Sequence, residues 1–230
     1  METIDPVPVE LDADVLRTMK GVTRRLSDEL LPLLDQARSK IEAKAVYSVM
    51  RVKCLDKDQV LLENGCSLRG IVLVDMLQSG QDIIPHVITV GSKLESMASK
   101  EPNLLRAWFI EKVADYALEK ALQYVRAQAT KKLGEVVSVF SPGSGTGDLF
   151  GLDQQHTLFK ILDPANHIGV SLTSSCMMVP RKSVSGVFAA TSEEYIACEY
   201  CPRECETRTR PFRGVSLRPA VAEEKAFSIS

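Results

Sequence analysis

The stretch LFKILDPANHIGVSLTSSCMMVPRKSVSGVFAAT, from Leu158 to Thr191, decides the fold more than any other part of this 230-residue chain. Its first residues complete the segment QQHTLFKILD, whose apolar positions recur at helical spacing and predict a short helix. The segments GVSLTSS and SVSGVFAAT follow and predict strands. This local mixture of helix and strand is typical of an α+β fold.

The rest of the chain extends the same mixture. Residues 12–44 predict two helices, the second beginning at Ser27, and residues 101–133 predict one long helix whose aromatic side chains belong to the core. Residues 45–55 and 59–65 flank the turn DKD and predict a hairpin, residues 67–80 predict a helix, and residues 83–91 and 135–140 predict strands. The proline at position 85 favours an edge strand or a strand start. We therefore expect an α+β fold with an antiparallel, meandering sheet and flanking helices.

Composition excludes several classes of protein. The hydrophobic fraction is 45%, the charged fraction 25% and the net charge -2, which favours an ordinary globular protein and gives no reason to expect nucleic acid or an anionic membrane as a partner. No apolar run approaches the ~20 residues of a membrane span, and the acidic N-terminus has no secretory signal. We expect a cytoplasmic protein, in which cysteines stay reduced.

The segment SPGSGTGDLFG, residues 141–151, is a glycine-rich loop. It lacks the GK[ST] ending of a phosphate-binding loop and does not open a helix directly with GxGxxG, so neither nucleotide motif is present. From these residues alone a tight turn is favoured over an anion-binding loop. Glycines in such a turn also let a ligand approach the backbone closely.

Ordered matches over residues 138–191 resemble the activation domain of vitamin B12-dependent methionine synthase. The matches are the SPGSG loop, Gly169, the Leu172–Thr173 pair, Pro180 and the run Ser183-Val184-Ser185-Gly186; Leu162, Ser175 and Met178 complete them. The segment TVGSKLE also resembles stand-alone members of this family. The resemblance implies the fold of that domain, which divides the chain into an N-terminal helical segment (1–45), an activation-domain-like core (46–195) and a cysteine segment with a tail (196–230).

The resemblance also implies a function. The family's domain binds S-adenosylmethionine beside a corrinoid and serves the reductive remethylation of oxidised cobalamin. We expect an accessory subunit in trans for a cobalamin-dependent methyltransferase such as methionine synthase, in methionine biosynthesis, with ferredoxin or flavodoxin as a candidate electron donor. Whether the chain is itself an enzyme stays open. The alternative is a module that binds a corrinoid protein or S-adenosylmethionine with a structural zinc and no redox activity.

Residue by residue, the resemblance places the cofactor-binding surface at Ser141, Pro142, Gly143, Ser144 and Phe188. Three positions depart from the family's pattern. Val139 stands at the family's arginine, Ser144 at its loop tyrosine, and Phe188 at the tyrosine after SVSG. A guanidinium can hold a carboxylate through two hydrogen bonds, so the lost arginine removes a carboxylate contact. Arg181 or Lys182 either supplies this cation or is a solvated surface charge.

The segment CEYCPRECETR contains Cys198, Cys201 and Cys205 at the spacing C-x2-C-x3-C. Such thiols can hold an iron–sulfur cluster, which would bring a low-potential electron to the corrinoid, with Cys176 or Cys66 as candidate fourth ligands. The hypothesis of a structural zinc site is weakened because no second C-x2-C pair is present. The hypothesis of a metal-free dithiol–disulfide cycle is weakened because no βαβ pattern surrounds the motif. Arg203 and Arg208 either dock an acidic partner, stabilise the reduced cluster, or are exposed arginines that do neither. His156 either faces the ligand or is a helix-surface histidine.

Overall fold

The fold is organised around one central strand, β6 (Asp82–Thr89), in which every residue after Asp82 is buried. The computed structural model describes residues 1–11, 24–134, 137–145, 149–206 and 208–213. Strand β10 (Ser183–Ala190) pairs with β6 along almost its whole length, and β2 (Lys44–Tyr47) and β3 (Met50–Asp56) pair with it end to end. All of these pairings are antiparallel.

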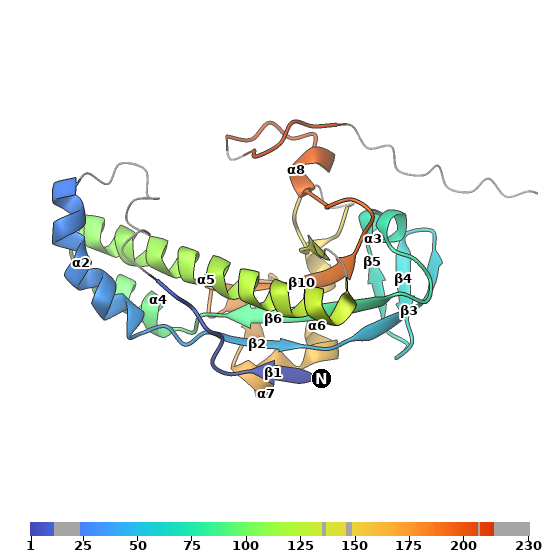
Figure 1. Cartoon of the computed structure of the whole chain (residues 1–230), viewed down its shortest axis with the longest axis horizontal. Coiled ribbons are helices and arrows are strands. Elements are labelled where there is room, and N and C mark those ends of the chain that lie inside the picture. Colours follow the sequence, from blue (N-terminus) through green and yellow to red (C-terminus); the bar gives the residue numbers. More distant parts are fainter. Residues whose placement is uncertain (12–23, 135–136, 146–148, 207, 214–230) are drawn as a thin grey trace, which may run out of the picture.

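The sheet has eight strands and curls at one end (Figure 1). Its path runs β1-β2-β6-β3-β4-β5, with β10 on the other side of β6 and β7 beyond β10. The strands not yet given are β1 (Glu2–Ile4), β4 (Gln59–Leu62), β5 (Ser67–Arg69) and β7 (Val137–Phe140). A separate two-stranded ladder joins β8 (Ser171–Leu172) to β9 (Met178–Val179). The predicted α+β class with an antiparallel sheet and flanking helices is confirmed.

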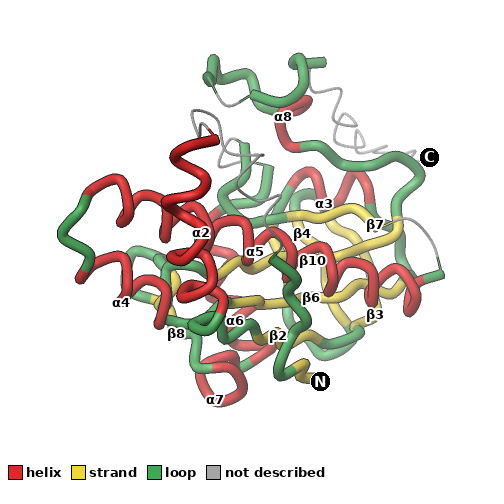
Figure 2. The backbone as a smooth tube through the Cα atoms, turned by 60° about the vertical axis from the view of Figure 1, so that its left-hand side comes forward, coloured by secondary structure: helices red, strands yellow, loops and turns green. Residues whose placement is uncertain are grey.

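Different helices cover the two faces of the sheet. The long helix α5 (Leu104–Leu133) lies across one face together with α2 (Arg24–Arg38) and α4 (Lys93–Lys100), as Figure 1 shows. The opposite face carries α6 (Gln155–Leu162), which follows the short 3-10 turn η1 (Leu152–Gln154), and α7 (Pro164–Ile168), seen on the far side of the strands in Figure 2. Two short helices, α3 (Ile71–Met76) and α8 (Ala197–Tyr200), lie near the curled end of the sheet.

Helix α5 begins and ends where its sequence provides caps. The side chain of Asn103 accepts hydrogen bonds from the backbone N–H groups of Leu105 and Arg106, and Gly134 ends the helix with a φ of 76°. Between them, alanines alternate with larger apolar residues on the buried stripe, and small side chains let a helix lie close to the sheet. The predicted long helix is confirmed, with its first turn at Leu104 rather than at Glu101.

The predicted hairpin is confirmed, but two predictions about the sheet are wrong. Residues 67–80 do not form one helix, because Ser67–Arg69 pairs with β4 as strand β5 and α3 ends at Met76. Pro85 lies in the central strand and not at an edge. It is tolerated there because it lies opposite the break between β2 and β3, where its carbonyl accepts from the N–H of Ser48 and no ladder donor is lost.

The N-terminal segment packs on the core. Strand β1 pairs with β2, and the apolar side chains of α2 join the hydrophobic cluster under α5; they are Leu30, Leu33, Leu34 and Ala37. The described part of helix α2 already includes Arg24, so Ser27 lies inside the helix and is not its start, and residues 12–23 lie outside the described residues. In the part of the chain that the structure describes, none of the helices has the length and apolar character to cross a bilayer.

Candidate functional site

The glycine loop after β7 is a tight turn with little room for larger residues. The N–H of Gly143 donates to the carbonyl of Phe150 (2.8 Å), and that of Ser144 donates to the carbonyl of Ser141 (3.1 Å). Gly143 and Gly145 have φ values of 81° and 83°, which side chains disfavour. A Cβ on Gly145 would also lie 2.7 Å from the Leu149 side chain. Two of the loop's N–H groups therefore already donate hydrogen bonds within the protein and are not available to an anion. Residues 146–148 lie outside the described residues.

Phe188, the fifth residue of the predicted binding surface, lies in the core and not on the loop's surface. Its ring is fully buried and stacks on the ring of His86, with centroids 3.7 Å apart and planes 14° from parallel. Its neighbour across the β7–β10 ladder is Val139, and both pack in the cluster beneath α5. Val139 and Phe188, which lack the polar groups of the family's pattern, therefore pack in the same apolar layer. An apolar residue at one position suits an apolar residue at the other.

His86 was not singled out by its sequence context, yet it is the most unusual titratable group of the described core. Burial lowers its pKa to about 3, so the ring is neutral at physiological pH. Its Nδ1 lies 3.4 Å from the carbonyl oxygen of Ile84, and its Nε2 has no hydrogen-bond partner among the described residues. Gly186 faces it across the ladder, and a Cβ there would lie 2.5 Å from the Phe140 carbonyl oxygen and 3.1 Å from the imidazole.

Arg181 and Lys182 are engaged elsewhere and do not replace the family's arginine. Arg181 pairs with Glu95 on α4 (2.5 Å) and with Glu111 on α5 (3.3 Å). Lys182 pairs with Glu111 (2.7 Å) and Asp115 (2.5 Å), and only 14% of its side chain is exposed. These pairs fasten the chain between β9 and β10 to the two helices. The solvated alternative does not describe Lys182, which is largely buried, and both cations are held in ion pairs with α4 and α5.

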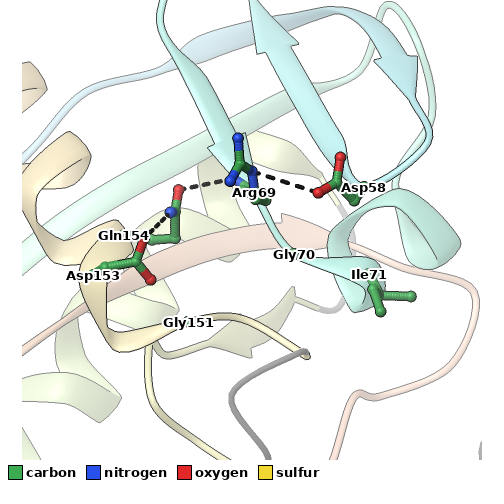
Figure 3. A pocket seen from close by; sticks show the side chains of 7 residues that line it. All are labelled: Asp58, Arg69, Gly70, Ile71, Gly151, Asp153 and Gln154. Atoms are coloured by element: carbon green, nitrogen blue, oxygen red, sulfur yellow. Dashed lines mark hydrogen bonds and ion pairs between the residues drawn. The ribbon is translucent and has the colours of Figure 1, made fainter.

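A charged pocket adjoins the glycine loop (Figure 3). It has a volume of about 210 Å³ and is lined by Asp58, Arg69, Gly70, Ile71, Gly151, Asp153 and Gln154. The bond from Gly143 to Phe150 places the loop directly before Gly151, so the predicted surface and the pocket are continuous. The sequence did not indicate this pocket because its residues come from three separate segments, at position 58, at 69–71 and at 151–154, although the chain's glycine pattern had marked the last of them.

Gln154 braces the charged groups of the pocket. It is only 9% exposed, and its amide oxygen accepts from the backbone N–H of Arg69 (2.8 Å) while its amide nitrogen donates to Asp153 (2.7 Å). The guanidinium of Arg69 lies 3.5 Å from the Asp58 carboxylate, and Figure 3 shows these side chains around the pocket. Both partners of that pair are more than half exposed, so it contributes little to stability and can share its donors with a ligand.

The three cysteines lie on and after α8, beside the glycine loop. A Cβ on Gly145 would lie 3.8 Å from the Cβ of Cys201. The Arg208 guanidinium donates to the carbonyls of Cys198 (2.9 Å) and Cys201 (2.8 Å) and also to that of Arg203, so it fixes the backbone of this segment. Hydrogen bonds from the backbone and side chain of Thr209 lower the pKa of Cys198.

No metal site is formed by the side chains in the described ranges: no group of three or more His, Cys, Asp or Glu residues is placed to hold an ion. Of the two candidate fourth ligands, Cys66 lies before β5, where its N–H donates to the Asn64 side chain. Cys176 pairs instead with His156, its Sγ 3.3 Å from Nε2. His156 is exposed on α6, as one of its two readings expected. The iron–sulfur ligand set therefore stays a prediction from spacing.

Comparisons with known proteins agree with this fold. Residues 142–205 match the family described as "Vitamin B12 dependent methionine synthase, activation domain". The match begins in the glycine loop and ends at Cys205, so it includes the cysteine segment that the resemblance in sequence had left outside. No curated protein matches the chain. A solved structure titled "Crystal Structure of the MetH Reactivation Domain bound to AdoHcy" superposes with a TM-score of 0.61 and 14% identity, covering 85% of this chain and 80% of that one.

The two comparisons meet on the same part of the molecule. The family match begins in the glycine loop and contains α6, α7, β10 and α8, and the structural match extends the likeness in fold to most of the chain. With its curled antiparallel sheet and flanking helices, this chain has the fold of that reactivation domain, and its residues 142–205 match the family of vitamin B12-dependent methionine synthase activation domains.

Proposed function

We propose that the chain is an accessory subunit that binds an S-adenosyl ligand and serves the reductive reactivation of a cobalamin-dependent methyltransferase. The observation that carries this proposal is the coincidence of the family match with the glycine loop, on a fold shared with a reactivation domain bound to AdoHcy. Cobalamin belongs to the partner protein and is the substrate of the reactivation. The chain's own part is to bind and orient the methyl donor.

The loop suits an S-adenosyl ligand better than a nucleotide phosphate. Its Gly143 and Ser144 N–H groups already donate within the loop and to Phe150, so they are not offered to an anion. An S-adenosyl ligand has no phosphate, and it needs a surface that the adenosine can approach closely. Glycines at 143 and 145 provide that surface, with Ser141 and Ser144 as hydroxyl partners.

The two apolar departures, Val139 and Phe188, support the loop from the core side. Phe188 stacks on His86 and packs in the cluster beneath α5, and the neutral imidazole brings no charge close to a sulfonium ligand. The role of Phe188 is thus to pack beneath β7 and support the loop that follows it. A ligand that binds on this loop meets Pro142 and the glycines first.

A binding experiment tests the first half of the proposal. Calorimetric titration of the full chain with S-adenosylhomocysteine should show a saturable site that Ser144→Trp abolishes by filling the loop's surface. Ser99→Trp, at an exposed position on α4, is the matched control and should bind as the wild type does. Absence of binding to the wild-type chain contradicts the proposal.

A reactivation experiment tests the second half. A cobalamin-dependent methyltransferase in its cob(II)alamin form is given S-adenosylmethionine and reduced ferredoxin or flavodoxin, with and without the chain. We expect the methylcobalamin spectrum to return only when the wild-type chain is present, and not with Ser144→Trp. Ligand binding without any gain in remethylation would favour the alternative, a binding module without redox activity.

The iron–sulfur prediction is a separate question, and the proposed function does not depend on it. Among the described residues no group of three or more His, Cys, Asp or Glu side chains is placed to hold an ion, so no step is assigned to a cluster. Anaerobic purification followed by iron, sulfide and zinc analysis of the wild type and of Cys201→Ser decides it. Iron and sulfide that disappear in the variant would establish an electron-transfer site, zinc would establish a structural one, and no metal would leave a plain thiol segment.

A further inference from the structure

The pocket beside the glycine loop has a charge pattern that matches one particular chemical group. Figure 3 shows a guanidinium, from Arg69, and two carboxylates, from Asp58 and Asp153, around the same small volume. A pocket for a simple anion would not contain two acids, and a pocket for a simple cation would not contain an arginine. The combination is complementary to a zwitterion that carries a carboxylate and an ammonium group.

The backbone of Arg69 and Asp58 and the carboxylate of Asp153 are held by hydrogen bonds before any ligand binds. The buried Gln154 connects the backbone of Arg69 to the carboxylate of Asp153 through bonds of 2.8 Å and 2.7 Å. The N–H of Gly70 donates to the carbonyl of Asp58 (2.8 Å), which fixes the hairpin turn against the start of α3. Preorganised polar groups lose little freedom when a ligand arrives, so their contacts translate more fully into affinity.

Gly70 lets the walls of the pocket approach one another. A Cβ at this position would lie 2.8 Å from the carbonyl oxygen of Leu149 and 3.1 Å from the Phe150 ring, so any larger residue would push the loop away. The N–H of Val72 donates to the same Leu149 carbonyl at 3.3 Å. The pocket and the glycine loop are therefore parts of one continuous surface.

We infer that this pocket binds the zwitterionic amino-acid end of the S-adenosyl ligand, with Arg69 on its carboxylate and Asp153 on its ammonium group. This inference rests on the proposed function and names the residues that replace the lost arginine. Val139 lies in an apolar layer, and Arg181 and Lys182 are paired with α4 and α5. Arg69 reaches the loop from a different strand, β5, and 68% of its side chain is exposed to an incoming ligand.

The test compares two ligands that differ only at this end. S-adenosylhomocysteine has the amino-acid group, and 5′-methylthioadenosine keeps the adenosyl thioether but lacks it. Calorimetric titration of the full chain should show S-adenosylhomocysteine binding about tenfold or more tightly, because charge-assisted hydrogen bonds are strong. Arg69→Gln should remove this preference, lowering the affinity for S-adenosylhomocysteine about tenfold or more and leaving that for methylthioadenosine unchanged.

The matched control is Arg51→Gln, an exposed arginine on strand β3 of the same sheet that pairs with Asp82 and does not line the pocket. It should keep the wild-type preference. Arg69→Lys should give an intermediate preference, because an ammonium cannot hold a carboxylate through two parallel bonds. A melting temperature close to that of the wild type should show that Arg69→Gln still folds.

Two outcomes overturn the inference, and only the second of them also overturns the proposed function. If Arg69→Gln binds S-adenosylhomocysteine with the wild-type preference, the pocket has no role in binding the amino-acid end, while the proposed function stands. If neither ligand binds the wild-type chain, the proposed function fails and the inference fails with it.

Discussion

Replacing His86 by phenylalanine should remove a pH dependence from the stability of the fold. His86 is wholly buried, and burial lowers its pKa from 6.5 to about 3. The unfolded chain therefore binds a proton near pH 6.5 that the folded chain refuses until about pH 3. Between these two pH values protonation stabilises the unfolded state relative to the native state. The free energy of unfolding is therefore highest above pH 6.5 and decreases as the pH falls.

The size of the effect follows from the two pKa values. Each pH unit between them costs about 1.4 kcal/mol, so going from pH 7 to pH 5 should cost about 2 kcal/mol through His86 alone. Phenylalanine keeps an aromatic ring against Phe188 and has no nitrogen to protonate. The larger ring can change the free energy of unfolding of His86→Phe by about 1–3 kcal/mol at any one pH. The quantity to compare is therefore the change in the free energy of unfolding with pH.

Urea unfolding followed by far-ultraviolet circular dichroism at pH 7, 6 and 5 measures this change. The wild type should lose about 2 kcal/mol more than His86→Phe across that range. His167→Phe on α7, where the histidine is exposed, is the control and should behave like the wild type. Equal pH dependence in the wild type and in His86→Phe would refute the argument, because it would mean that the folded chain protonates His86 as readily as the unfolded chain.

Three further predictions concern stability and the cysteine segment. Gly186→Ala should destabilise the fold by about 1–3 kcal/mol in urea unfolding, since its Cβ would lie 2.5 Å from the Phe140 carbonyl oxygen; a loss below about 0.5 kcal/mol would show that the strands shift freely. Asn103→Ala should cost about 1 kcal/mol by removing the cap of α5, whereas Asn103→Ser should restore most of it, and no difference between them would contradict a capping role. Arg208→Ala should speed limited proteolysis after α8 by releasing the carbonyls that it binds, and an unchanged digestion pattern would argue against this clamp.

The candidate site could be predicted from the sequence only in part. Ordered matches located the glycine loop, and the family match begins there. The same reasoning placed Phe188 beside the loop, although the pleat of β10 turns the Phe188 ring toward His86. Arg69 went unnoticed because it lies 72 positions before Ser141 and comes close only when β5 folds onto the turn before α6.

The local elements with strong periodicity or clear caps could be read from the sequence alone. The long helix between Asn103 and Gly134, the hairpin on either side of Lys57 and the strand of SVSGVFAAT follow from side-chain pattern and turn chemistry, which act over a few residues. Only the tertiary structure decided which strand is central, why Pro85 is tolerated there, and which charges meet at the pocket. Those outcomes depend on pairing between residues far apart in the chain, and no local pattern records which distant partner a backbone or a side chain will find.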